Sequence, residues 1–258
     1  METSLIATKV QVPAARVNLV DRPRLLNKLD AALKYSLLLV SAPAGFGKTT
    51  LVSEWIRHIE QKGISTAWLS LDEQDNDPTR FWEYFISAMQ TSKPMIGKTA
   101  MSFLNSNEKP DIDAIVTMVI NDLTAIPADF TLVLEDYHYI KNQEIHRSLN
   151  FLLERLPPRM HLVVVTRLDP ALRLAHFRGK GMLSEIRAEE LRFTIKETNY
   201  LLKALDCPEL SPENLCALNA RTEGWVVGLK MAFLSLKGEK DIPGFIANFT
   251  GSQRYIMD

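Results

Sequence analysis

A loop rich in small residues, Ala42-Pro-Ala-Gly-Phe-Gly-Lys-Thr49, lies between the apolar run 37–40 and the apolar-periodic segment 51–56. This order of buried strand, tight loop and helix N-terminus is the order that a P-loop requires. Gly45 and Gly47 allow positive φ, so successive N–H groups can turn inward around phosphate oxygens. The helix that follows adds the positive end of its dipole. The residues expected to contact a nucleotide through this loop are Ala44, Gly45, Phe46, Gly47, Lys48, Thr49 and Thr50.

Two side chains of the loop carry its phosphate chemistry. Lys48 can neutralise the β- and γ-phosphates, and the Thr49 hydroxyl can ligate Mg²⁺. Ala42 stands where the motif usually has glycine, and we interpret it as a tolerated variant because the conformational requirement there is milder than at Gly47. The sequence therefore predicts binding of a nucleoside triphosphate, ATP or its product ADP, with Mg²⁺.

Composition limits the class of protein. With 258 residues, 46% of them hydrophobic and 24% charged, the chain is an ordinary globular protein with material for one large or two smaller domains. A net charge of −1 offers no electrostatic footprint for nucleic acid, so this segment alone should not bind DNA. Cys207 and Cys216 are expected to be free thiols in a reducing compartment. The absence of a signal-peptide core and of a long apolar run predicts a cytoplasmic protein without membrane contact.

Strand-like and helical segments alternate through the first three quarters of the chain. Nearly unbroken apolar runs at 37–40, 65–71, 130–134 and 161–166, with a shorter strand-like stretch near 184–186, are separated by helical patterns. Helices are predicted at about 25–35, 48–62, 112–125 and 142–156, with a further one carrying the aromatic stripe 81–85. This pattern predicts an α/β fold, a parallel P-loop NTPase sheet sandwiched between helices.

From residue 194 onward only helices are predicted, at about 194–206, 211–221, 223–237 and 241–249. We therefore expect an N-terminal arm at 1–22, a P-loop ATPase domain at 23–190, and a small helical domain at 191–249. The segment 250–258 is interpreted as the start of a truncated winged-helix domain. The arm is expected to be extended, the segment 91–110 to be an irregular connection, the acidic segment 72–78 to be a solvated loop, and the aromatic stripe to be core.

Polar residues follow two of the predicted strands. Glu135-Asp136 ends the third strand, where a first acid can hold the metal and a second can polarise the attacking water. Arg167 follows the fourth strand and can reach a γ-phosphate. An exposed acidic strand end and a surface arginine are the alternatives for these positions. His138 is interpreted as a packing residue.

These segments together resemble the N-terminal nucleotide-binding region of the maltose-regulon-activator-like, ATP-dependent LuxR-type transcriptional regulators, which belong to the STAND class of P-loop ATPases. The matching stretches cover nearly the whole chain: 8–10, 22–26, 41–50, 68–72, 76–82, 134–138, 166–170, 191–194, 222–229 and 251–255.

The resemblance implies a molecular switch, in which ADP holds a closed monomer and an inducer with ATP opens it for self-association, while slow hydrolysis resets it. It implies that Lys48 and Thr49 hold phosphate and Mg²⁺, that Arg167 senses the γ-phosphate, and that Arg22 lies near the adenine. The family usually has two aspartates where this chain has Glu135-Asp136, a departure that puts hydrolysis in question more than binding. The inducer-sensing repeats and the DNA-binding domain of the family have no counterpart in these 258 residues.

Two other functions use the same phosphate site. One is an enzyme or motor, such as a AAA-type remodelling ATPase or a phosphotransferase, although the sequence offers no base for an acceptor pocket. The other is a scaffold that binds nucleotide without hydrolysing it, which the glutamate at position 135 favours.

Overall fold

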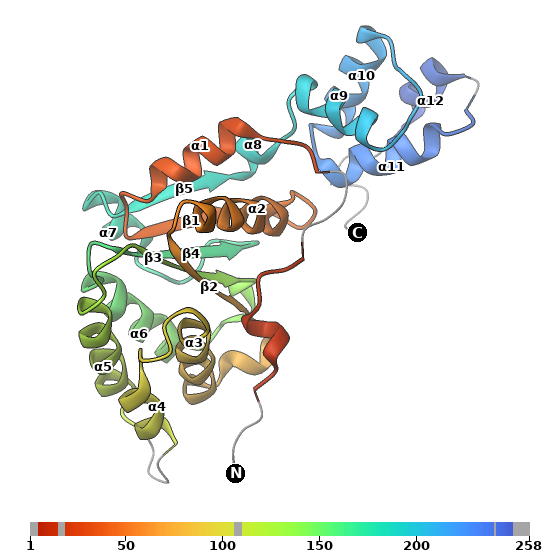
Figure 1. Cartoon of the computed structure of the whole chain (residues 1–258). Helices are drawn as coiled ribbons and strands as arrows, with labels where there is room; N and C mark the ends of the chain where they lie inside the picture. The colour runs from red at the N-terminus through yellow and green to blue at the C-terminus, as the bar shows by residue number, and fades with distance from the viewer. Residues whose placement is uncertain (1–4, 15–18, 106–109, 240, 250–258) are drawn as a thin grey trace.

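The computed structural model describes residues 5–14, 19–105, 110–239 and 241–249 (Figure 1). Five strands form one parallel sheet in the order β2-β3-β4-β1-β5. Their bounds are β1 Leu37–Ser41, β2 Ser65–Ser70, β3 Phe130–Glu135, β4 Met160–Thr166 and β5 Leu183–Arg187. Every residue of β1, β3 and β4 is buried, as expected for central strands of a parallel sheet covered on both faces. The predicted α/β fold is confirmed.

Helices cover both faces of the sheet (Figure 1). One face packs against α1 (Pro23–Ala32) and α2 (Lys48–Gln61), and the other against α3 (Pro78–Ser92), α5 (Ile112–Thr124) and α6 (Gln143–Glu154). Alternate strand residues divide between the two cores: Leu39 and Val164 face one, Val40 and Val165 the other. Shorter helices are α4 (Lys98–Leu104), α7 (Leu174–Gly179) and α8 (Ala188–Leu191).

The last four described helices form a separate cluster beside the carboxyl edge of the sheet (Figure 1). They are α9 (Ile195–Ala204), α10 (Pro212–Thr222), α11 (Val226–Leu236) and α12 (Ile242–Asn248). They enclose their own apolar core, which includes Leu218, Leu229 and Phe233. We refer to α9–α12 as the helical region and to the rest as the sheet body. None of the helices in the described ranges is both long and apolar enough to cross a membrane.

An ion cluster centred on a buried glutamate fastens the helical region to the sheet body. Glu197 on α9 accepts hydrogen bonds from Arg22, at 3.1 and 3.3 Å, and from Arg24, at 3.0 and 3.1 Å. It also accepts 2.8 Å from the backbone N–H of Thr194, in the capping box that starts α9. Burial alone would raise the pKa of Glu197, but the hydrogen bonds from Arg24 and Arg22 outweigh it, and the pKa is lowered. We refer to Arg22, Arg24 and Glu197 as the clamp.

Some expectations about local structure are wrong. The segment 91–110 is not simply irregular, because α3 continues to Ser92 and α4 lies within it, with Ala100 and Leu104 buried. A helix as short as α4, with seven residues, has too few turns for the helical spacing of its apolar residues to be recognised in the sequence. The arm is not wholly extended, since a 3₁₀ helix spans Ala7–Val10. The first helix ends at Ala32 rather than near residue 35. The expected winged-helix start at 250–258 lies outside the described residues.

The acidic segment 72–78 is also not a solvated loop throughout. It contains a 3₁₀ helix, Glu73–Asn76, and Asp75 within it is fully buried. Asp75 pairs with Lys9 of the arm and, at 3.2 Å, with Arg80. The arm therefore supplies the buried cation Lys9, and the burial of Asp75 could not be predicted from the residues around it in the sequence. The aromatic stripe is core as expected, because Phe81, Trp82, Tyr84 and Phe85 are all buried.

Loss of charge at the clamp should cost far more stability than loss of charge at a surface pair. Glu197→Gln leaves two arginines facing a neutral amide in a buried site, and we expect a loss of about 3 kcal/mol in the free energy of unfolding. The matched control is Glu223→Gln, which removes a pair with Arg192 whose side chains are 49% and 44% exposed. That change should stay within about 1 kcal/mol. Urea unfolding measures both, and equal losses would show that the clamp contributes no more than a surface pair.

Candidate functional site

The loop between β1 and α2 has the backbone that phosphate binding requires. Gly45 and Gly47 have φ of +79° and +77°, in the left-handed region that favours glycine. Gly47 is the N-cap of α2 and no side chain caps the helix there, so N–H groups at the start of α2 remain available to a ligand. The loop lies where β1 has β4 on one side and β5 on the other, which is the switch point of the sheet order.

Lys48 is a buried cation that makes no ion pair among the described residues, although the carboxylates of Asp136 and Glu135 are near enough to act on its pKa. Its side chain is folded back on the loop, where Nζ donates 3.0 Å to the carbonyl oxygen of Pro43, and the residue is 7% exposed. Burial lowers the pKa of Lys48 to about 8, while Asp136 opposes this shift and Arg167 adds to it. Such a desolvated cation is stabilised by an incoming anion, so the loop is electrostatically prepared for phosphate.

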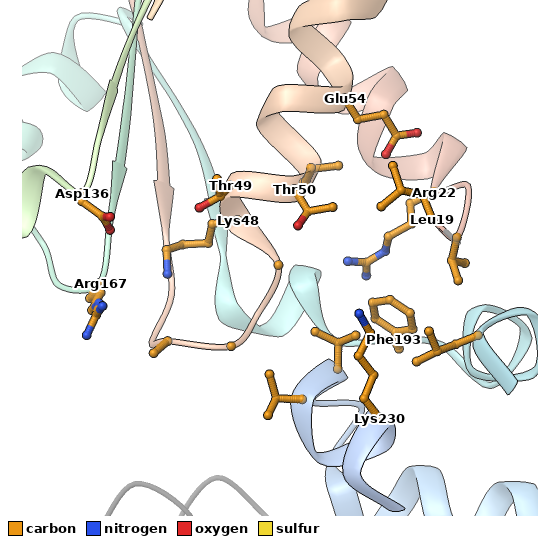
Figure 2. Close-up of a pocket in the computed structure, with 18 residues that line it drawn as sticks. Leu19, Arg22, Lys48, Thr49, Thr50, Glu54, Asp136, Arg167, Phe193 and Lys230 are labelled. Carbon is orange, nitrogen blue, oxygen red and sulfur yellow. The ribbon is translucent and has the colours of Figure 1, made fainter. Parts of the chain in front are cut away.

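The two acids at the end of β3 have different surroundings. Glu135 is 5% exposed and hydrogen-bonded by the Thr49 hydroxyl and, at 3.4 Å, by Ser70. Burial raises the pKa of Glu135, and the nearby Asp136 raises it further. Asp136 has φ of +54°, and its half-exposed carboxyl faces the cavity beside Lys48 (Figure 2). The strand end is therefore not merely an exposed acidic edge, because Glu135 is buried against the P-loop threonine.

Arg167 follows β4 and lines the same cavity as Lys48 and Asp136 (Figure 2). The residue is exposed, and no ion pair or hydrogen bond of its side chain is found within the described ranges. The loop that carries it is held by Thr166, whose hydroxyl donates 2.7 Å to the carbonyl oxygen of Leu168. Arg167 is thus a surface arginine at the mouth of the phosphate site, with its guanidinium free to meet a ligand.

The cavity has a volume of about 330 Å³ and lies between the P-loop and the helical region. This is within the range of small-molecule sites in proteins. Arg22 lines it but is not a surface residue: it is 5% exposed, and Nη2 donates 2.9 and 3.0 Å to the carbonyl oxygens of Leu191 and Arg192. Its guanidinium carbon stands 4.3 Å from the ring centre of Phe193. Arg22 is therefore a fixed part of the cavity wall, held in place by its hydrogen bonds to Glu197 in the clamp.

The first turn of α11 lies directly against the P-loop. The indole N–H of Trp225 donates 3.2 Å to the carbonyl oxygen of Ala44. A Cβ placed on Gly45 would come within 2.7 Å of that indole nitrogen and 2.9 Å of Val227. Gly45 is therefore needed for the close approach of the helical region as well as for its φ. We refer to Trp225 and Val227 with Ala44 and Gly45 as the loop contact.

The structure gathers most of the residues predicted from the sequence. Those that line the cavity are Arg22, Ala44, Gly45, Gly47, Lys48, Thr49, Thr50, Asp136 and Arg167. Phe46 does not, because its side chain packs in the core between the sheet and α2. Glu135 lies behind Thr49 rather than on the cavity wall. Lining residues that sequence reasoning missed are Leu19, Val20, Leu51, Glu54, Phe193, Leu201, Val226, Val227 and Lys230. Glu54 lies one helical turn after Thr50, but a glutamate on an amphipathic helix is usually solvated, so its position alone did not indicate the cavity.

The residues present fit a nucleotide with Mg²⁺. Lys48 makes no ion pair within the described residues, and Thr49 and Glu135 offer adjacent oxygens of the kind that Mg²⁺ prefers. No group of three or more His, Cys, Asp or Glu side chains in the part of the chain described could hold a metal by itself. Mg²⁺ would thus be shared with the phosphates, as is usual for this ion, and would neutralise charge on them.

Solved structures place this fold among the P-loop ATPases. A STAND protein with a tetratricopeptide repeat sensor from Pyrococcus horikoshii superposes with a TM-score of 0.59 at 17% identity, over 85% of this chain and 30% of that one. A Walker-type ATPase of Pyrococcus abyssi superposes with a TM-score of 0.54 at 13% identity, over 93% of this chain and 73% of that one. These likenesses are of fold. The parallel sheet and the loop geometry define a domain with the P-loop NTPase fold.

Sequence relatives are more specific. The chain is 33% identical over 233 residues to the HTH-type transcriptional regulator MalT of Cronobacter sakazakii, a match that covers 90% of this chain and 25% of the relative. MalT of Serratia proteamaculans matches at 33% over 236 residues with the same coverage. No family model matches the chain. The chain is a homologue of the MalT-type regulators and spans about a quarter of their length, so the resemblance expected from its motifs is confirmed.

The loop contact should distinguish two glycines that share a backbone conformation. Gly63 has φ of +84° with nothing within 4 Å of an added Cβ, whereas Gly45 faces Trp225. Gly63→Ala should cost only the strain of left-handed backbone, about 1–2 kcal/mol, and leave ADP affinity unchanged. Gly45→Ala should carry the same strain and also displace Trp225, weakening ADP binding about tenfold or more. Calorimetric titration with ADP compares the two, and equal affinities would contradict the role assigned to the contact.

The pKa of Lys48 predicts a pH dependence. Because the cation binds phosphate and its pKa is about 8 in the unliganded protein, ADP affinity should fall as the pH rises above about 8, approaching tenfold per unit. The unfolded lysine keeps its proton up to about 10.5, so the unliganded fold should gain stability from this group between about 8 and 10.5. Titrations from roughly pH 6.5 to 9.5, which bracket that pKa, measure the affinity. Lys48→Ala is the control and should bind weakly without this slope; an identical slope in the variant would assign it elsewhere.

Proposed function

We propose that this chain is the ATP- and ADP-binding switch module of a transcriptional regulator, in which nucleotide state controls opening of the helical region and self-association. Its MalT-type relatives are named as HTH-type transcriptional regulators, and their names support the regulatory role. Any contact with DNA would be made through parts outside these 258 residues, because the chain carries a net charge of −1.

The observation that carries the proposal is that the cavity is built from both parts of the chain. Lys48, Thr49 and Arg167 come from the sheet body, whereas Phe193, Val226 and Lys230 belong to the helical region or its entry. A ligand can shift an equilibrium only by binding one arrangement better than another. A nucleotide that contacts both parts binds their closed arrangement better than an open one. Its binding can therefore shift the equilibrium between the closed and open arrangements.

The site residues suggest how the nucleotide would be held and turned over. Backbone N–H groups from Ala44 to Thr50 would bind the phosphates, with Lys48 opposite the β- and γ-phosphates. Thr49 and Glu135 would hold Mg²⁺. Asp136, half-exposed beside Lys48, would orient and deprotonate the attacking water.

Slow turnover is part of the proposal. Glu135 stands where the family that the chain resembles usually has aspartate, and this longer side chain alters the metal geometry and puts hydrolysis in question more than binding.

The experiment that tests the proposal is identification of any nucleotide released on acid denaturation of the purified chain, followed by its steady-state ATPase rate. Retained ADP with slow turnover supports a switch held closed by its product. An empty site with fast turnover would instead favour a remodelling ATPase or phosphotransferase. Lys48→Ala is the control for both measurements, because it removes the cation from the phosphate site and should retain no nucleotide.

Arg167 should discriminate the triphosphate from the diphosphate. Its guanidinium has no other partner in the described ranges and stands at the phosphate end of the cavity. Arg167→Ala should lower ATP affinity about tenfold, the loss of one charge-assisted contact, and leave ADP affinity nearly unchanged. Arg147→Ala, which removes an exposed arginine paired with Asp113, is the control. If the ratio of the two affinities does not move, Arg167 is not a γ-phosphate sensor.

A further inference from the structure

The cavity has two chemically different ends (Figure 2). Lys48, Asp136 and Arg167 lie at the P-loop end. Away from them, the wall combines apolar side chains, including Leu19 and Phe193, with the cations Arg22 and Lys230, and the carboxyl group of Glu54 points into this part. An anionic carboxylate repels phosphate, so the far end is suited to an uncharged part of a ligand.

Glu54 is the acidic group of this end, and no role has been assigned to it so far. It is half-buried, and within the described residues it makes no ion pair or hydrogen bond. Burial and then the carboxylate of Asp21 raise the pKa of Glu54, with Arg57 and Arg22 opposing the shift. A half-buried carboxylate without donors is costly, and neutral O–H or N–H donors of a ligand would relieve that cost.

The position of Glu54 along α2 selects which donors it can meet. Thr50 and Glu54 lie four residues apart and therefore on one face of the helix, with Glu54 about 6 Å further along the axis. Measured from Lys48 the distance along the axis is about 9 Å. In a nucleoside diphosphate held at the P-loop, the sugar is the first uncharged part after the phosphates. A pair of neighbouring hydroxyl groups offers two donors to the two oxygens of one carboxylate.

We propose that Glu54 accepts hydrogen bonds from the ribose hydroxyl groups of the bound nucleotide and makes the site selective for ribonucleotides over deoxyribonucleotides. This assignment rests on the proposed function, because it deepens the description of the same cavity. The base then lies beyond the sugar, against Phe193 and the neighbouring apolar wall. Glu54 is a specificity-determining residue in this scheme, and the P-loop contacts remain as they are without it.

The test compares ADP, 2′-deoxy-ADP and 3′-deoxy-ADP by calorimetric titration against the unchanged chain, Glu54→Gln and Glu54→Ala. The unchanged chain should prefer ADP about tenfold over each deoxy analogue, the loss of one hydrogen bond to a charged group. Glu54→Ala should bind all three alike, and Glu54→Gln should keep a reduced preference because its amide oxygen still accepts. The matched control is Glu83→Gln: Glu83 on α3 is also half-buried with a raised pKa, but does not line the cavity.

The outcomes separate the inference from the function on which it rests. No binding of any nucleotide by the unchanged chain would overturn the proposed function itself. Binding without a ribose preference, or a preference that survives in Glu54→Ala, would overturn the assignment of Glu54 alone. An equal loss for all three nucleotides in Glu54→Ala would also overturn it, since that result means that the carboxylate supports the fold or the phosphate end rather than the sugar.

Discussion

The buried carboxylate of Glu197 is the interaction on which the arrangement of this molecule depends. Arg22, just before α1, and Arg24, in its first turn, donate hydrogen bonds to it, and the backbone N–H of Thr194 at the start of α9 donates another. Removing such charges from water is expensive, and the cost is offset only when every partner is in place. The helical region is therefore set against the sheet body in a defined orientation, and the cavity between them exists because of that orientation.

The two connections between the helical region and the sheet body differ in strength. The clamp is charged, centred on the buried pair Arg22 and Glu197, and made of several hydrogen bonds. The loop contact rests on a single hydrogen bond from Trp225 and on van der Waals packing against Gly45. Any separation of the two parts would break the loop contact before the clamp. A ligand at the P-loop thus acts at the weaker of the two connections, and the clamp end of the cavity stays formed.

The fold and the phosphate loop could be predicted because their signals are local. Unbroken apolar runs and glycine spacing are properties of short stretches, and the structure confirms β1, β3, β4 and the P-loop close to the expected bounds. What could not be predicted depends on partners far away in sequence. Asp75 is buried because Lys9 reaches it, and the role of Arg22 depends on Glu197. Glu54 was hidden by its place on an ordinary amphipathic helix, where a glutamate is usually a solvated residue.

The position of Trp225 has an optical consequence. The chain has four tryptophans, and Trp55, Trp68 and Trp82 are sealed in the cores of the sheet body with at most 1% exposure. Trp225 alone among them binds the P-loop with its indole N–H. Movement of the helical region would change the solvation of this indole while leaving the other three as constant background. The molecule therefore carries an intrinsic fluorophore at the boundary between its two parts, and closure could be followed in the unlabelled protein.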